Sequence, residues 1–232
     1  MGDYYSEHLG GLRLEEVYQL ASPRIRQYLR AETEHVVRRV SGMGRVLELG
    51  CGYGRALRVI APHVGRAVGA DIAPSSVSYG KRFLRDVANS ELVRMDAART
   101  GFRDASFDAV ICIQNGISAF GVSRPLLLTE ATRLTRDGGV VLFSSYSPGI
   151  WEERLEWFRA QSRAGLVGEL DESQSRDGTI VCKDGFRSFT VPGEEFSALF
   201  RAIGESPSIR EIDGSSVFAE VVKSGVRPEP KR

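Results

Sequence analysis

Residues 45–54 read RVLELGCGYG, an apolar run followed by three glycines at alternate positions. The run is typical of a short buried strand, and the glycines permit the positive φ angles of a tight turn. A helix is expected over 54–61. In open α/β sheets ligands bind at such turns, outside the carboxyl ends of the strands. The segment therefore predicts a strand, a ligand-binding loop and a helix in succession.

The alternation continues on both sides of this unit and predicts a parallel sheet covered by helices on both faces. Two helices are expected within 12–40, separated by Ser22-Pro23. After residue 146 the alternation of strands and helices ends, and a helix is followed by an insertion rich in Gly, Asp and Ser. The further strands are expected at 67–72, 92–95, 107–113, 140–145, 209–212 and 217–222, and the further helices at 75–87, 125–134, 150–164 and 192–203.

Composition sets broad limits on the function. The 232 residues carry a net charge of +1, which gives no reason to expect nucleic acid as a partner. No apolar run resembles a signal peptide or reaches the length of a membrane span, so a cytoplasmic protein without a membrane partner is expected. Three separated cysteines, Cys51, Cys112 and Cys182, form no metal-ligand pattern and are expected to be reduced and packed.

Three acids follow or end neighbouring predicted strands: Glu48, Asp71 and Asp96. Carboxyl ends of parallel strands share one edge of a sheet, so these side chains should gather there. Asp71 can accept hydrogen bonds from ribose hydroxyls, and Asp96 from an adenine amino group beside the Ala97 amide. Each aspartate could instead cap a turn. A dinucleotide fold would need a glycine where Arg55 stands in the G-x-G-x-x-G pattern.

At this point the sequence resembles the class I S-adenosylmethionine-dependent methyltransferases, over about residues 45–145. The resemblance implies S-adenosylmethionine as cofactor, with its methionine part over the glycine loop. It also implies a Rossmann-like three-layer α/β sandwich with a seven-stranded, mostly parallel sheet whose last strand is antiparallel. The cofactor-binding residues that it implies are Glu48, Gly50, Cys51, Gly52, Gly54, Asp71, Ile72, Asp96, Ala97, Gln114 and Asn115.

The expected organisation is a single methyltransferase domain over residues 1–225 with four parts. Residues 1–44 form a helical cap, 45–147 the cofactor-binding core, 148–190 an insertion that acts as a lid, and 191–225 the last helix and strands. Residues 226–232 are expected to be a disordered tail. The oligomeric state is left open.

Methyl transfer from a sulfonium needs alignment and exclusion of water more than a strong catalyst. A base is needed only if the acceptor must lose a proton. Tyr4 is a candidate for covering the cofactor, and Tyr5, His8 and Tyr146 are the candidates for acceptor contact or catalysis. The other histidines, His35 and His63, are expected on the surface.

Several alternatives stay open for the acceptor and the function. A small-molecule acceptor is expected, since Gln114-Asn115-Gly116 lacks the Asp/Asn-Pro-Pro-aromatic pattern of enzymes that methylate nucleic-acid bases. A lipid intermediate such as a quinone stays open, since apolar acceptors leave little signature. Arsenite would need converging cysteines: Cys51 and Cys112 could approach the same edge, but Cys182 lies in the insertion. Outside the transferases, the chain could be a non-catalytic cofactor-binding protein or a dinucleotide-dependent oxidoreductase.

Overall fold

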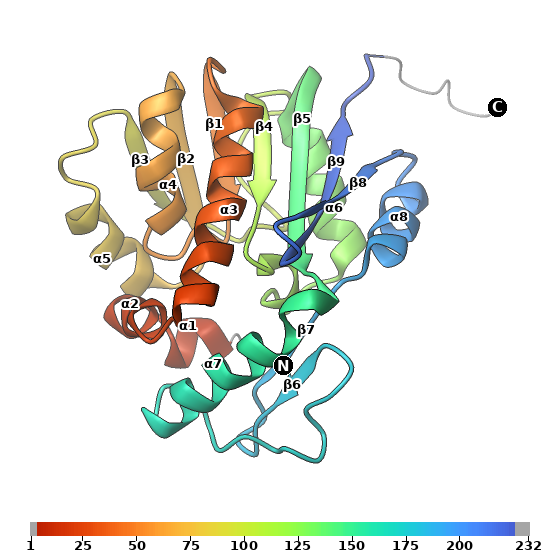
Figure 1. The fold of residues 1–232 in the computed structure, drawn as a ribbon. Coiled ribbons are helices and arrows are strands. Elements are labelled where there is room, and N and C mark those ends of the chain that lie inside the picture. Colours follow the sequence, from red (N-terminus) through yellow and green to blue (C-terminus); the bar gives the residue numbers. More distant parts are fainter. Residues whose placement is uncertain (1–3, 226–232) are drawn as a thin grey trace.

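The computed structural model describes residues 4–225; residues 1–3 and the expected tail at 226–232 lie outside the described residues. Its centre is a seven-stranded sheet with helices on both faces (Figure 1). The strand order is β3-β2-β1-β4-β5-β9-β8; β9 pairs antiparallel with both β5 and β8, and the other neighbouring strands pair in parallel. The predicted three-layer α/β fold with an antiparallel last strand is therefore confirmed. The strands are β1 (Arg45–Leu49), β2 (Arg66–Asp71), β3 (Ser90–Arg94), β4 (Phe107–Cys112), β5 (Thr135–Tyr146), β8 (Ser208–Ile212) and β9 (Ser216–Val222).

The strand order reverses between β1 and β4, which are paired neighbours. From β1 the chain proceeds outward to β2 and β3, and from β4 it proceeds the other way to β5. The loops that follow β1 and β4 consequently diverge and leave a crevice at the carboxyl edge. This topology sets the position of the site.

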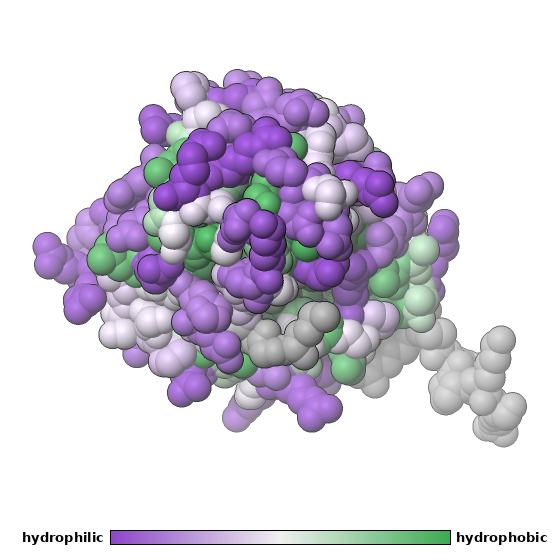
Figure 2. Space-filling model, turned by 90° about the horizontal axis from the view of Figure 1, so that it is seen from below, coloured by the Kyte–Doolittle hydropathy of each residue, from purple (hydrophilic) through white to green (hydrophobic). Residues whose placement is uncertain are grey.

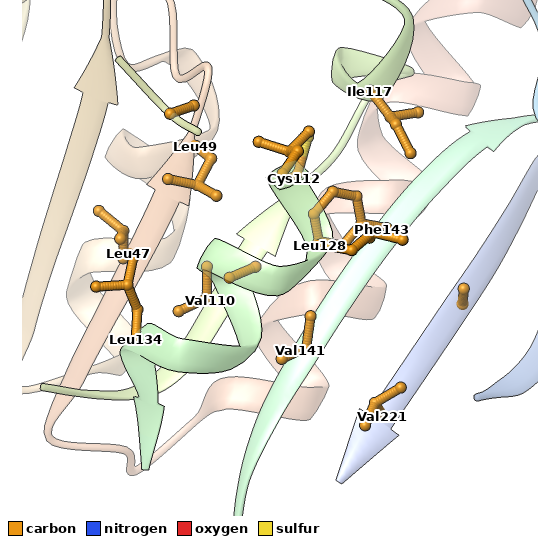
Figure 3. Packing of buried hydrophobic residues seen from close by; sticks show 14 of the residues in the cluster. Leu47, Leu49, Val110, Cys112, Ile117, Leu128, Leu134, Val141, Phe143 and Val221 are labelled. Carbon is orange, nitrogen blue, oxygen red and sulfur yellow. The ribbon is translucent and has the colours of Figure 1, made fainter. Parts of the chain in front are cut away.

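Helices cover the two faces of the sheet with separate apolar cores. α3 (Pro23–Val40), α4 (Arg55–Ile60) and α5 (Pro74–Phe83) pack on one face. On the other face lie α6 (Arg124–Leu134) and α8 (Gly193–Ala202). Figure 3 shows how side chains of alternate strand residues, such as Leu47, Val110 and Val141, meet the apolar face of α6. Successive strand residues point to opposite faces of the sheet, and helices bury both faces. The central strands are therefore continuous apolar runs in the sequence.

A third group of elements lies beyond the carboxyl edge of the sheet, and we refer to it as the cap (Figure 1). It has its own apolar core, which joins the N-terminal helices to the insertion. Trp157 connects the two parts, since its indole N–H donates to the Val17 carbonyl at 3.0 Å. Seen from the cap side, the surface is mostly hydrophilic with smaller hydrophobic areas between (Figure 2). The cap consists of α1 (Tyr4–His8), α2 (Leu12–Gln19), α7 (Trp151–Arg163), β6 (Thr179–Val181) and β7 (Arg187–Phe189).

Local signals placed most helix starts correctly. Ser22 caps α3 by accepting from the Ile25 amide at 3.2 Å, with Pro23 in the first turn. Short 3-10 turns were not predicted: η1 (Ala61–His63), η2 (Gly116–Ser118) and η3 (Pro148–Ile150).

Two expectations were wrong. The strand expected at 140–145 begins earlier, because β5 starts at Thr135 and includes Asp137, Gly138 and Gly139. The β4–β5 register shifts between Phe107 and Ala109, and this irregularity accommodates Gly138 at φ 72°.

His35 is not on the surface, although it lies in a charged stretch of sequence. Its side chain is buried, and its Nε2 lies 2.7 Å from the Glu220 carboxylate of β9. Arg39 contacts the same carboxylate at 2.9 Å. Burial lowers the pKa of His35 and outweighs the pull of Glu220 in the other direction. His63, as expected, is exposed.

Within residues 4–225, no helix combines the length and the apolarity needed to cross a membrane. The three cysteines are free and buried, as predicted.

Candidate functional site

A cleft lies between the carboxyl edge of the sheet and the cap. It encloses about 970 Å³ of empty space, its open mouth included. Its wall takes residues from the ends of β2, β1, β4 and β5, in that spatial order, and from α1, α2 and β7 of the cap. The predicted site residues in this wall are Tyr5, Glu48, Gly50, Cys51, Gly52, Asp71, Ile72, Gln114, Asn115 and Tyr146.

The glycine loop forms the centre of the wall. Gly50, Gly52 and Gly54 all have positive φ, at 71°, 55° and 85°. The Gly50 amide donates to the Ala70 carbonyl of β2 at 2.8 Å, which holds the loop against the sheet. A Cβ on Gly50 would lie 2.7 Å from the Phe120 ring. The loop thus needs glycine for both its backbone angles and its close packing.

Glu48 and Arg55 face the cleft on either side of this loop. The Glu48 side chain is buried, and its Oε2 has no hydrogen-bond partner among the described residues. Burial raises the pKa of Glu48 to about 8, against an opposing effect of the Arg55 charge. Arg55 lies over the Tyr18 ring at 4.6 Å, while its buried Nε and Nη2 find no acceptor in residues 4–225. Such atoms are rare in folded proteins and point to a polar ligand.

Glu32 of α3 lies close by and was missed by the sequence reasoning. It is fully buried, and burial raises its pKa to about 7. Its Oε2 accepts from the Gln114 amide at 3.1 Å. The available signal was its spacing, since Glu32 falls on the apolar stripe of α3 with Ile25, Leu29 and Val36.

Asp71 and Ile72 end β2 at the next position along the edge. Both Asp71 oxygens accept backbone bonds, from Gly52 at 2.8 Å and from Ala73 at 2.9 Å. Asp71 therefore fixes the glycine loop as well as the start of α5. Ile72 is 43% exposed in the cleft wall, where a flat apolar ligand could cover it.

Asp96 and Ala97 do not contribute to the cleft wall as the structure describes it. Asp96 is exposed, and its Oδ1 accepts from the Ala98 amide at 2.9 Å in a local turn. The Ala97 side chain packs into the core behind the sheet. Their role toward an adenine remains a prediction.

Gln114 and Asn115 follow β4 on the far side of the crevice. Both adopt left-handed backbone angles, with φ of 55° and 60°, which is strained for residues other than glycine. Tyr18 donates to Gln114 Oε1 at 3.0 Å, while the buried Gln114 Nε2 has no partner among the described residues. Asn115 is used internally: it donates to Ser118 Oγ and to the Phe189 carbonyl.

The structure separates the aromatic and histidine candidates. Tyr5 and Tyr146 line the cleft, and burial raises both pKa values, that of Tyr146 to about 12. Tyr4 and His8 lie outside the cleft wall, with their rings 4.5 Å apart. Tyr4 donates to Asp184 of the insertion, and His8 is exposed. Gly54, also predicted for the cofactor, caps α4 from behind the wall.

A family model described as a methyltransferase domain matches residues 46–139, from β1 into β5. This match covers the glycine loop and the β2 and β4 ends that form the cleft. Residues 46–139 therefore match a methyltransferase domain, in agreement with the resemblance to the class I S-adenosylmethionine-dependent methyltransferases.

Individual relatives agree with this methyltransferase assignment over the same core. The chain is 32% identical to a fatty-acid O-methyltransferase of Mycolicibacterium smegmatis over 53% of its length, and 31% identical to a malonyl-[acyl-carrier protein] O-methyltransferase of Serratia marcescens over 50%. These matches span 43% and 46% of the relatives' own lengths.

Among solved structures, one described as a DhpI–SAM–HEP complex has a similar fold. It covers 97% of this chain and 96% of its own, with a TM-score of 0.64 and 22% identity. The similarity of fold thus extends beyond the segment matched by sequence.

Proposed function

We propose that this methyltransferase binds S-adenosylmethionine in the cleft and transfers its methyl group to a small-molecule acceptor. The observation that carries the proposal is the set of unpartnered polar atoms beside the glycine loop, which come from a carboxyl group and from a guanidinium. Glu48 Oε2 and two nitrogens of Arg55 are buried in the wall without partners among the described residues. A zwitterionic amino-acid group would satisfy both.

The remaining wall residues fit the rest of that molecule in the order of the strands. Asp71, one strand away from Glu48, offers carboxylate oxygens for ribose hydroxyls. Ile72 offers an exposed apolar side chain for a purine face. Asp96 and Ala97 follow β3, beyond this point, and are proposed for the adenine edge.

The bound cofactor would supply a methyl group that is already activated on a sulfonium sulfur. The chain's own residues would then orient the reactants and exclude water. The cap covers the carboxyl edge of the sheet. Along this edge Gln114, which follows β4, lies between Asp71 at the end of β2 and Tyr146 at the end of β5. Tyr5 and Tyr146, with raised pKa values, are neutral at physiological pH and can donate hydrogen bonds to an acceptor.

Calorimetric titration with S-adenosylmethionine and S-adenosylhomocysteine tests the proposal. We expect binding of both by the wild type, and at least tenfold weaker binding by Asp71→Ala, whose circular dichroism spectrum should remain native. Glu152→Gln, at an exposed position of α7, is the matched control. Unchanged affinity in Asp71→Ala would contradict the assignment.

Two further measurements separate the other classes of function. Nicotinamide fluorescence that changes on titration would favour an oxidoreductase. Formation of S-adenosylhomocysteine with a panel of acceptors separates an enzyme from a non-catalytic binding protein.

A further inference from the structure

Arg154 of α7 is a fully buried arginine behind the cleft. Its side chain is 0% exposed. Nη1 donates to the Gly178 carbonyl at 2.7 Å, and Nη2 donates to the carbonyl and the hydroxyl of Ser188 at 3.0 Å each. Its Nε is buried without a partner among the described residues.

This guanidinium forms no ion pair with any carboxylate in residues 4–225. The charged or polar groups that act on it are the phenols of Tyr146, Tyr5 and Tyr28. Its carbon lies 4.3 Å above the Tyr146 ring, which gives a cation–π contact. Burial raises the pKa of each tyrosine, so none supplies a negative charge. A buried cation without a counter-charge is costly.

A purely structural role explains only part of this arrangement. The two Nη atoms join α7 to the strand β7 and to Gly178, which stabilises the cap. Neutral carbonyl and hydroxyl groups, however, accept hydrogen bonds without neutralising the charge. The positive charge and the unpartnered Nε remain without an explanation.

The groups around Arg154 form one end of the cleft. Tyr5, Tyr146 and Ser188 all line it, and Ser188 Oγ is also an acceptor for Arg154. Tyr146 ends β5, three strand positions from Asp71 in the order β2-β1-β4-β5, or about 14 Å at the usual strand spacing. This end is therefore distant from the ribose position of the proposed cofactor.

The other charged groups of the cleft belong to its remaining parts. Glu48, Arg55 and Asp71 border the glycine loop, as described above. Glu32 is engaged with the Gln114 amide beneath the wall. Arg154 is thus the positive charge next to the end formed by Tyr5, Tyr146 and Ser188, while Glu32 is an acid that acts on Tyr146.

We propose that the methyl acceptor is a carboxylic acid whose ionised carboxylate lies against Tyr5, Tyr146 and Ser188 and is balanced by Arg154. The hydroxyls would donate to the carboxylate, and the guanidinium would supply the opposite charge. One buried positive charge matches a monoanion, whereas a phosphate dianion would leave an excess negative charge. This inference rests on the proposed function, because it concerns the acceptor that shares the cleft with the cofactor.

The test measures acid-against-amide preference in the protein saturated with S-adenosylhomocysteine. The probes are benzoate with benzamide, octanoate with octanamide, and glutarate with glutaramide, titrated calorimetrically, with phenyl phosphate as a further anion. We expect at least one acid to bind tenfold or more tightly than its amide. Arg154→Gln should abolish this preference, and Arg154→Lys should retain much of it. Affinity for S-adenosylhomocysteine should be unchanged in both variants.

If the Arg154 variants do not fold, Tyr146→Phe and Ser188→Ala replace them, since each removes one hydroxyl and keeps the charge. We expect each to reduce the acid preference severalfold. The proposal is overturned if no acid binds the wild-type complex better than its amide. It is also overturned if the folded variants keep the full preference, or if phenyl phosphate binds more tightly than benzoate. Failure of the wild type to bind S-adenosylhomocysteine would instead contradict the proposed function.

Discussion

The burial of Glu48 makes the stability of the ligand-free protein depend on pH. Its pKa is raised from 4.5 to about 8, so the folded state holds a proton that the unfolded state has already lost. The contribution of Glu48 to stability is then largest below about pH 4.5 and decreases as the pH rises toward 8. Each pH unit in this range is worth about 1.4 kcal/mol. Between pH 5 and pH 8 the loss due to Glu48 amounts to about 3 kcal/mol, once the curvature near both pKa values is included.

Glu48→Gln removes this titration while it preserves the shape of the side chain. We expect urea unfolding at pH 5, 6.5 and 8 to show a decrease for the wild type that is about 3 kcal/mol larger than for the variant. For a chain of this size the difference corresponds to about 6–12 °C in melting temperature. The comparison uses the change in unfolding free energy with pH, so any pH-independent destabilisation by the buried amide of the variant cancels. Glu152→Gln, at an exposed position, should follow the wild type. If the free energy of unfolding changes with pH in the same way for Glu48→Gln and the wild type, this reasoning is refuted.

Three further substitutions probe the loop, a buried ion pair and a strained turn. Gly50→Val places a side chain against Phe120 at φ 71°, so affinity for S-adenosylhomocysteine should fall at least tenfold, and unchanged calorimetry would contradict the described loop. Glu220→Ala removes the buried carboxylate that pairs with Arg39 and contacts His35, and should lower the free energy of unfolding by about 3 kcal/mol in urea titrations; a loss below 1 kcal/mol would mean a negligible pair. Ala105→Gly relieves the backbone strain of an exposed residue with a left-handed φ of 53°. It should raise the melting temperature by about 2–4 °C without changing cofactor affinity. A lower melting temperature would argue against that backbone angle.

The sequence was sufficient to predict the sheet because its signals are local and repeat along the chain. Apolar runs at 45–49 and 107–112, each followed by polar or glycine-rich loops, identified the strands and the edge that carries the site. Ser22-Pro23 marked a helix start through capping chemistry that involves only its neighbours.

The missed features depend on partners far apart in the chain. His35 lies in a charged stretch, and its burial follows from Glu220 in the last strand, 185 positions away. Arg154 resembles any arginine on an amphipathic helix until the insertion folds back over it. Tyr4 and His8 were predicted to act at the cleft, but they lie four residues apart on one face of α1, with their rings 4.5 Å apart, and do not line the cleft as Tyr5 does.

The position of β9 has a consequence for synthesis and truncation of the chain. Among the strands within residues 4–225 this one comes last in the sequence, yet it lies inside the sheet between β5 and β8 and pairs with β5 at seven positions, from Val140–Val222 to Tyr146–Ser216. A nascent chain that has not yet released residues 216–222 from the ribosome would present Val-Val-Leu-Phe of β5 as an open, apolar edge. Such edges recruit other chains. Premature stop codons before this strand are therefore expected to yield aggregates and not a smaller, active protein.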